Sequence, residues 1–249
     1  MVALGAAIEA DILSGNRKDM VLLDVTPLSL GIEMVGGLMD VIIPRNNKIP
    51  TKIAKEYTTS VDGQVNLAIT IYQGERELVK DNRKLAAFDL KGIPAMPAGL
   101  PKIEIIFIIN ADGILKVSAK ELRSGVEQDI EVKPSYGLTD EQVEDMLKAS
   151  LQNAQADMNK RLIEEVRNEG KQLLYLIERF LEKNKSILSA EEIKETKRLA
   201  MDLENKIDSH DKRDTITASI EALNDYTKPF AERHMDSTVK DALSGKNIY

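Results

Sequence analysis

Apolar and polar residues alternate in short runs along the first half of the chain, which is the pattern of half-buried β-strands. Residues 65–72 show it most clearly, with Val65, Leu67, Ile69 and Ile71 at every second position. Residues 51–61 form a second run rich in β-branched and aromatic residues. The two runs flank Asp62-Gly63, and this pair predicts a tight hairpin between them.

Turn signals divide the rest of this half. Asp112-Gly113 and Ser124-Gly125 separate the apolar runs 103–109, 115–119 and 126–132. Pro94, Pro97 and Pro101 mark one long irregular connection. Short strands separated by regularly spaced turns predict an antiparallel β-sandwich over residues 25–137.

After Gly137 the apolar residues follow a helical period instead. Thr139 with Gln142 forms a capping box, which predicts the start of a helix that runs to about Lys183. Gly170 is a weak point within this helix, because glycine costs about 1 kcal/mol relative to alanine.

Two shorter helices are expected further on. Ser189 with Glu192 starts one of them, and residues 215–234 form the other, with an interruption at Pro229. The second half therefore predicts a long helix that leads into a small antiparallel bundle, and the whole chain an α+β fold.

Composition narrows the classes of function. The net charge of −7 and the lack of a basic cluster argue against a nucleic-acid partner. The absence of cysteine excludes disulfides and thiolate metal sites, and agrees with a reducing cytoplasm. Residues 2–13 look apolar, but Glu9 and Asp11 interrupt them, so they predict neither a signal peptide nor a membrane span.

No catalytic constellation stands out in the sequence. His210 and His234 are its two histidines, and both lie in charged, helix-rich surroundings. The carboxylates are spaced to pair with lysine and arginine on helix faces. No glycine-rich phosphate loop occurs. We therefore expect a chain that is not an enzyme and that holds no metal or cofactor of its own.

One string in the chain is far more specific than these patterns. Residues 20–31 read Met-Val-Leu-Leu-Asp-Val-Thr-Pro-Leu-Ser-Leu-Gly. This string resembles the interdomain linker and first strand of the DnaK-type heat-shock chaperones, and the resemblance continues through nearly the whole chain. It implies four parts: the end of the last ATPase-domain helix (1–19), the linker (20–24, with Val21, Leu22, Leu23 and Asp24), a client-binding β-sandwich (25–137) and a helical lid (138–249). ATP and Mg²⁺ would bind in the ATPase domain, which is absent from this sequence, so we expect a fragment.

The resemblance also implies a groove that clamps an extended, leucine-rich peptide through main-chain hydrogen bonds and one deep apolar pocket. An arch over the peptide falls on Val35 and Ser60, and the main-chain contacts fall on Met34 and Thr59. From the residues alone, Leu67 and Ile69 are ordinary core side chains of a hairpin, and only the resemblance places them in a pocket. The pocket falls on five residues: Ile32, Tyr57, Leu67, Ile69 and Ile103.

In these chaperones two polar pairs latch the long helix to the sandwich. The first pair falls here on Lys171 and Ala98, which cannot form an ion pair. The second falls on Tyr175 and Asp62, where only a hydrogen bond from a hydroxyl to a carboxylate is possible. The resemblance therefore implies a lid that is held more loosely than in the general chaperone.

Three further segments resemble the HscA branch of the family, which serves iron–sulfur cluster assembly. They are Gly-Ile-Pro-Ala-Met-Pro-Ala-Gly (92–99), Val-Lys-Pro-Ser-Tyr-Gly-Leu-Thr-Asp (132–140) and Phe-Ala-Glu-Arg-His-Met-Asp (230–236). This likeness implies that the client is the scaffold protein IscU, recognised through a Leu-Pro-Pro-Val-Lys segment. It also implies that the co-chaperone is the J-protein HscB.

Three other functions stay open at this point. A general DnaK-type chaperone fragment would bind many unfolded, leucine-rich clients. An adaptor protein would carry its partner site on the helices rather than on the strands. An enzyme would need an activated nucleophile or an acid–base pair, and the sequence shows neither.

Overall fold

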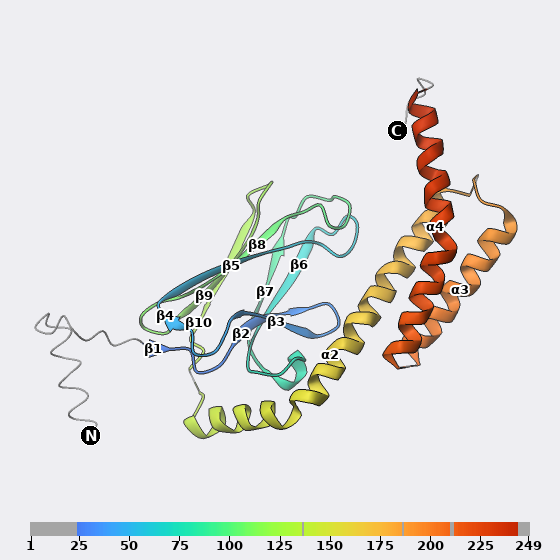
Figure 1. The fold of residues 1–249 in the computed structure, drawn as a ribbon. Helices are drawn as coiled ribbons and strands as arrows, with labels where there is room; N and C mark the ends of the chain where they lie inside the picture. The colour runs from blue at the N-terminus through green and yellow to red at the C-terminus, as the bar shows by residue number, and fades with distance from the viewer. Residues whose placement is uncertain (1–23, 136, 186, 210–211, 244–249) are drawn as a thin grey trace, which may run out of the picture. The chain divides into compact units, whose positions relative to one another are not determined.

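The computed structural model describes residues 24–135, 137–185, 187–209 and 212–243, which Figure 1 shows as a ribbon. The chain divides into two compact units, residues 1–154 and residues 155–249. The expected ATPase-helix remnant (1–19) and the linker residues Val21, Leu22 and Leu23 lie outside the described residues. Asp24, the last residue of the expected linker, begins the first strand.

The first unit is built from antiparallel sheets. We call β3-β2-β6-β7 the first sheet and β10-β9-β8-β5 the second sheet, each in the order of hydrogen-bonded neighbours. A short pair, β1 with β4, lies apart from both, and a 3₁₀-helix, η1 (Val79–Asp81), precedes β7. The strands are β1 (Asp24–Val25), β2 (Leu30–Met34), β3 (Leu38–Ile43), β4 (Lys48–Ile49), β5 (Thr51–Tyr57), β6 (Asn66–Gln73), β7 (Arg83–Lys91), β8 (Ile103–Ile109), β9 (Leu115–Glu121) and β10 (Glu127–Val132).

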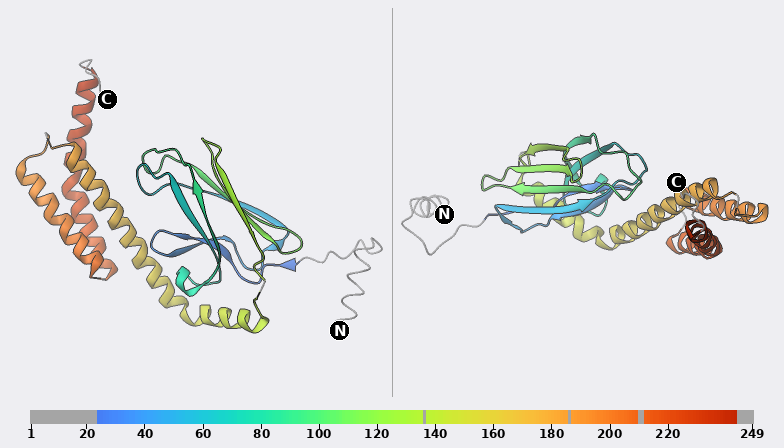
Figure 2. Two further views of the ribbon diagram at one scale, coloured as in Figure 1. Left: turned by 180° about the vertical axis from the view of Figure 1, so that it is seen from behind. Right: turned by 90° about the horizontal axis from the view of Figure 1, so that it is seen from above.

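Both four-stranded sheets contribute to one hydrophobic core. Every second residue of β8 is buried, from Ile103 to Ile109. Ile69 and Ile71 of β6 belong to the same core. Figure 2 shows the strands of the first unit in two layers. Since successive side chains of a strand point to opposite faces, the alternation over residues 65–72 indicated that Leu67, Ile69 and Ile71 share a face, and all three contact this core. Val65, which precedes β6, is 44% exposed.

The hairpin predicted at Asp62-Gly63 is wrong. β5 pairs with β8 in the second sheet, whereas β6 pairs with β2 and β7 in the first. Residues 58–65 therefore cross from one sheet to the other. Gly63 has the positive φ of a turn residue (67°), but its amide donates to the carbonyl of Met96 instead of closing a two-residue hairpin.

The other two predicted turns do connect neighbouring strands. Asp112-Gly113 joins β8 to β9, with Ile109 opposite Leu115. Ser124-Gly125 joins β9 to β10, with Lys120 opposite Glu127. Both connections are short, so the strands that they join have no room to enter different sheets.

Three long helices follow the strands in the part of the chain that the structure describes: α2 (Asp140–Lys183), α3 (Ala190–Asp208) and α4 (Arg213–Leu243). Both predicted capping boxes are present. The amide of Gln142 donates to Thr139 Oγ1 (3.3 Å), and the amide of Thr139 donates to Gln142 Oε1 (3.0 Å). Ser189 and Glu192 exchange the same two bonds at α3. Antiparallel sheets followed by helices confirm the predicted α+β class.

The interruption expected at Pro229 is wrong, because α4 runs through this residue. A proline inside a helix removes one hydrogen bond and costs about 3 kcal/mol. Phe230, the next residue, is only 4% exposed and belongs to the core of the second unit. Burying such a side chain contributes about 1.5–3 kcal/mol, which offsets most of that cost and keeps the helix continuous.

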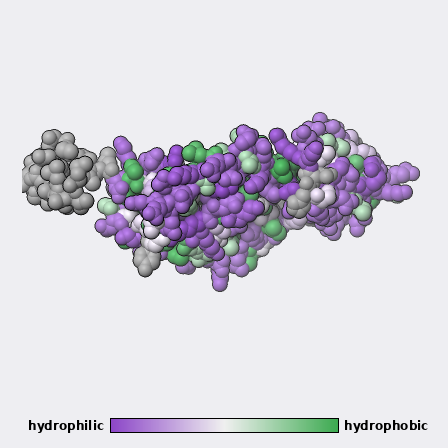
Figure 3. All heavy atoms as spheres, turned by 90° about the horizontal axis from the view of Figure 1, so that it is seen from below, coloured by the Kyte–Doolittle hydropathy of each residue, from purple (hydrophilic) through white to green (hydrophobic). Residues whose placement is uncertain are grey.

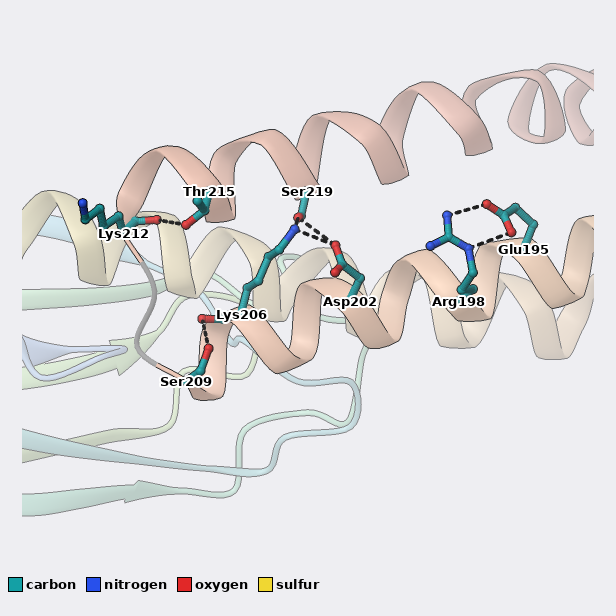
Figure 4. Close-up of polar contacts among 8 residues, drawn as sticks. All are labelled: Glu195, Arg198, Asp202, Lys206, Ser209, Lys212, Thr215 and Ser219. Atoms are coloured by element: carbon teal, nitrogen blue, oxygen red, sulfur yellow. Dashed lines mark hydrogen bonds and ion pairs between the residues drawn. The ribbon is translucent and has the colours of Figure 1, made fainter.

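The second unit has its own core, formed by apolar residues of α2, α3 and α4. Three polar residues beside this core, Asp202, Lys206 and Ser219, join α3 to α4, as Figure 4 shows. Lys206 Nζ lies 2.7 Å from both Asp202 Oδ2 and Ser219 Oγ, and Ser219 Oγ donates to Asp202 Oδ2 at 3.1 Å. The hydrogen bond from Lys206 holds the pKa of the Asp202 carboxyl below its ordinary value.

Gly170 is explained by packing rather than by flexibility. It is buried in α2, and a Cβ added there would lie 2.8 Å from Ile207 Cδ1 and 3.5 Å from Leu203 Cδ1 of α3. Ile207 and Leu203 are themselves 4% and 0% exposed, so neither has free space to move into. The missing side chain thus allows α3 to approach α2 closely.

We predict that Gly170→Ala does not give the gain of about 1 kcal/mol that helix propensity alone would supply. Overpacking a filled core costs about 1–3 kcal/mol, so the free energy of unfolding should fall by up to about 2 kcal/mol. Ile207→Val removes the obstructing Cδ1 atom. In that background Gly170→Ala should stabilise the unit. Urea unfolding followed by helical circular dichroism measures both; stabilisation by Gly170→Ala alone would contradict the packing explanation.

Candidate functional site

The five pocket residues expected from the sequence all belong to one apolar cluster. Ile32, Ile69 and Ile103 are buried members of the core, at 4%, 3% and 0% exposure, and Tyr57 and Leu67 pack against it while staying partly exposed. Tyr57 ends β5 directly opposite Ile103, the first residue of β8. The five residues therefore come from both sheets, and Tyr57 and Leu67 are the two of them that reach the surface.

Two loops next to this cluster carry exposed apolar side chains. The turn after β2 contains Val35, which is 59% exposed, and the crossing loop 58–65 contains Val61, which is 52% exposed. β2 runs antiparallel to β6, with Ile32 opposite Ile71, so its end at Met34 points toward the start of β6. The two loops thus lie at the same end of the first sheet.

The turn after β2 is short and tightly specified. Gly36 and Gly37 both have positive φ (83° and 70°), which side-chain-bearing residues rarely adopt. The amide of Gly37 donates to the carbonyl of Met34 (3.1 Å). Met34 itself is 38% exposed. A turn of this kind holds Met34 and Val35 at the surface.

Residues 92–102 form hydrogen bonds with the crossing loop and hold it in place. The amide of Gly99 donates to the carbonyl of Thr59 (3.0 Å), and the Thr58 hydroxyl donates to the carbonyl of Pro101 (2.7 Å). The amide of Ala98 donates to Asp62 Oδ1 (2.8 Å). These bonds fix the loop and leave Ser60 and Val61 exposed. The sequence predicted an irregular connection here and a likeness of residues 92–99 to the HscA branch, but not that this segment holds the crossing loop.

Thr59 and Ser60, neighbours in the crossing loop, differ in their exposure to solvent. Thr59 is 2% exposed, and its hydroxyl makes no hydrogen bond within the described residues. Thr59 is therefore covered by the protein, backbone included, and its carbonyl accepts the Gly99 amide. Ser60 is exposed, and its amide donates to Gln64 Oε1 (3.2 Å).

The residues expected to latch the lid lie in different units. Asp62 belongs to the first unit, where its carboxylate accepts the Ala98 amide described above. Lys171 and Tyr175 lie on α2 in the second unit; Lys171 is exposed, and Tyr175 has the Arg179 guanidinium 5.6 Å from its ring centroid. The latch thus stays a prediction.

One polar group beside the cluster was missed by sequence reasoning. The Tyr57 hydroxyl donates to Asp40 Oδ2 (2.7 Å), and Lys55 Nζ donates to Asp40 Oδ1 (2.9 Å). Burial, and then the hydrogen bond to Asp40, raises the pKa of the Tyr57 hydroxyl above its ordinary value. The available signal was Lys55, a charged residue at an inward position of a strand whose inward neighbours are Ile53 and Tyr57.

A second polar group lies at the other end of β2. The amide and hydroxyl of Ser29 donate to the two carboxylate oxygens of Glu75 (2.6 and 3.1 Å), and the amide of Arg45 donates to the Ser29 hydroxyl. Ser29 is 4% exposed. These bonds fix the start of β2 where the chain enters the first sheet.

Among the residues that the structure describes, no three metal-ligating side chains come together, and no helix is long and apolar enough to cross a membrane. Hydrophilic residues cover most of the face drawn in Figure 3, and the hydrophobic residues there form small separate patches.

Comparison with known proteins decides the family. The model of the Hsp70 protein family matches residues 1–236. The chain belongs to the Hsp70 family. This confirms the resemblance that the linker string indicated.

Curated relatives narrow the likeness. Proteins described as chaperone protein HscA homologs from Methylobacillus flagellatus, Mannheimia succiniciproducens and a Janthinobacterium species are 47%, 45% and 47% identical to the chain. Each alignment covers all of this chain but 40% of the relative. The chain therefore spans about two fifths of the length of these proteins, and its likeness to the HscA branch is confirmed.

Proposed function

We propose that this chain is the client-binding part of an HscA-type chaperone, in which the two sheets form a β-sandwich that clamps one extended peptide segment. The observation that carries the proposal is the group of five apolar core residues, two of them partly exposed, beside two loops that expose valine side chains. A contiguous exposed apolar patch commonly marks a binding surface, and these two loops lie at the same end of the first sheet. Family membership supplies the class of ligand.

The pocket would admit one apolar side chain of the client between Leu67 and Tyr57. The deeper residues, Ile32, Ile69 and Ile103, already have almost no exposed surface. A client side chain would therefore have to part the two outer residues before it reached the inner three. Loops around the pocket would then close over the peptide, with Val35 and Ser60 as the arch and the backbones of Met34 and Thr59 as hydrogen-bonding partners.

The carbonyls of Met34 and Thr59 accept in-chain bonds from Gly37 and Gly99. A carbonyl has two lone pairs, so each can accept a second bond from a peptide amide. Such main-chain bonds would hold any extended sequence, and the pocket would select among side chains.

The likeness to HscA supports a dedicated client. We propose that this client is an IscU-type scaffold protein bound through a Leu/Pro-containing segment, during cluster assembly or transfer in the cytoplasm. The whole protein would hydrolyse ATP in the domain that precedes this sequence, with Mg²⁺ and a J-protein of the HscB type. Helices α2, α3 and α4 would serve as its lid.

A peptide array tests the choice of client. We expect one Pro-containing sequence of the Leu-Pro-Pro-Val-Lys type to dominate, with a dissociation constant in roughly the micromolar range, as suits one pocket and a few main-chain bonds. A titration with that peptide, against a scrambled peptide of the same composition, gives the affinity. Equal binding of many unrelated leucine-rich peptides would instead favour a general chaperone.

Leu67→Phe should weaken binding of the Leu-Pro-Pro-Val-Lys peptide by at least about tenfold. The larger ring would fill the pocket entrance, so that about 1.5–3 kcal/mol of apolar burial is lost. Leu85→Phe is the matched control. Leu85 is also a partly buried leucine packed against the same core, but it lies near the opposite end of β7 from the partner of Leu67. Its variant should keep the affinity within about threefold, or 0.7 kcal/mol. Unchanged binding by folded Leu67→Phe would remove Leu67 from the pocket.

Removal of residues from Glu169 onward tests how firmly the proposed lid retains a client. The expected latch positions include Ala98 with Lys171, which cannot pair, so the lid should add little to retention. We predict that the truncation speeds dissociation of a labelled peptide by less than about tenfold, or 1.4 kcal/mol. Stopped-flow release measures it. An acceleration of a hundredfold would show that other contacts hold the lid.

A further inference from the structure

Three polar side chains meet between the two sheets of the first unit. Asp40 lies on β3, an edge strand of the first sheet, and Lys55 and Tyr57 lie on β5, an edge strand of the second. Lys55 Nζ is 2.9 Å from Asp40 Oδ1, and Tyr57 Oη is 2.7 Å from Asp40 Oδ2. Lys55 Nζ also donates to the carbonyl of Val41 (2.8 Å). One carboxylate thus receives two donors from the other sheet.

Strand register explains why these side chains face one another. Asp40 is opposite Ile32 and Tyr57 is opposite Ile103, and both of these isoleucines are buried in the core. Directly opposed residues in an antiparallel pair point to the same face, so Asp40 and Tyr57 project inward. The polar contact is therefore placed beside two of the five proposed pocket residues.

The geometry suits a contact that can open. The Lys55 and Asp40 side chains are 39% and 31% exposed, so water can replace their partners when the sheets separate. A hydrogen bond whose acceptor is charged is stronger than a neutral one, and two such bonds converge here on Asp40. The apolar core holds the middle of the sheets together, whereas this contact holds their edges.

We propose that Asp40, Lys55 and Tyr57 form a brace that ties the two sheet edges together beside the pocket and thereby slows its opening. Asp40 is a positioning residue in this proposal, since it fixes the Tyr57 ring as one wall of the pocket. The consequence for client release rests on the proposed function; the tie between the edges does not.

A simpler reading treats Asp40 and Lys55 as protection against edge-to-edge aggregation. Inward-pointing charges on edge strands commonly serve that purpose. Such protection needs the charges but not the hydroxyl of Tyr57. Tyr57→Phe keeps the ring and both charges while it removes one bond of the brace, so it separates the two readings.

The chain offers a matched control for this variant. Tyr72 also donates its hydroxyl to a carboxylate, that of Glu33, at 3.1 Å. Both residues belong to the first sheet, on β6 and β2, so this bond does not connect the two sheets. Tyr72→Phe therefore removes the same kind of hydrogen bond without affecting the brace.

Amide hydrogen exchange of the free chain tests the brace without any client. Tyr57→Phe and Asp40→Ala should speed exchange in residues 39–43 and 51–57 by about tenfold, while β9 keeps its protection. Tyr72→Phe should leave residues 39–43 and 51–57 unchanged. Equal exchange in wild type, Tyr57→Phe and Asp40→Ala would overturn the brace, whatever the chain binds.

Release of a labelled Leu-Pro-Pro-Val-Lys peptide tests the consequence. Tyr57→Phe should speed dissociation about tenfold, equivalent to 1.4 kcal/mol. The double variant that combines Tyr57→Phe with Asp40→Ala should release the peptide no faster than Asp40→Ala alone. In Asp40→Ala the acceptor of the Tyr57 hydroxyl is already gone. If Tyr57→Phe releases the peptide no faster than the control Tyr72→Phe, the proposal is overturned. If the wild-type chain binds no peptide, the proposed function fails, and hydrogen exchange alone decides whether the brace exists.

Discussion

The two four-stranded sheets of the first unit share a single apolar core, and most of its other features follow from this constraint. Both sheets are formed by the same chain, and β5 and β6, which follow one another in sequence, belong to different sheets. The chain must therefore cross between the sheets, as it does between β5 and β6. A crossing loop has no ladder to satisfy its backbone, so residues 92–102 supply the hydrogen bonds instead. The expected pocket residues Tyr57 and Leu67 lie on the two strands that this crossing connects.

Local signals in the sequence predicted the elements that depend on near neighbours. The capping boxes at Thr139 and Ser189, the alternation in β6 and the turn at Asp112-Gly113 each act within a few residues, and all are present. The partner of β6 could not be predicted in this way. Asp62-Gly63 has the chemistry of a hairpin turn, but the pairing depends on which sheet completes the core, and that is a property of the whole unit.

The site shows the same division between local and distant causes. The apolar residues of the cluster could be named from the family resemblance, and the core gathers all five. Asp40 was not among the predicted residues, because an acidic residue in a strand ordinarily faces water. Its partners are 15 and 17 residues away on a strand of another sheet. Only the register of two edge strands reveals that they meet.

Both units use one carboxylate with two donors at the border of an apolar core. Asp202 accepts from Lys206 and from Ser219, and it links α3 to α4. Asp40 accepts from Lys55 and Tyr57, and it links β3 to β5. Apolar contacts are non-directional, so they would tolerate small sliding movements of one element against another. A hydrogen-bonded carboxylate tolerates much less, since its donors must stay within about 3 Å and in line. The polar groups therefore fix the register that the cores leave free. Because both lie at exposed edges, they can also be broken without unfolding the core beside them.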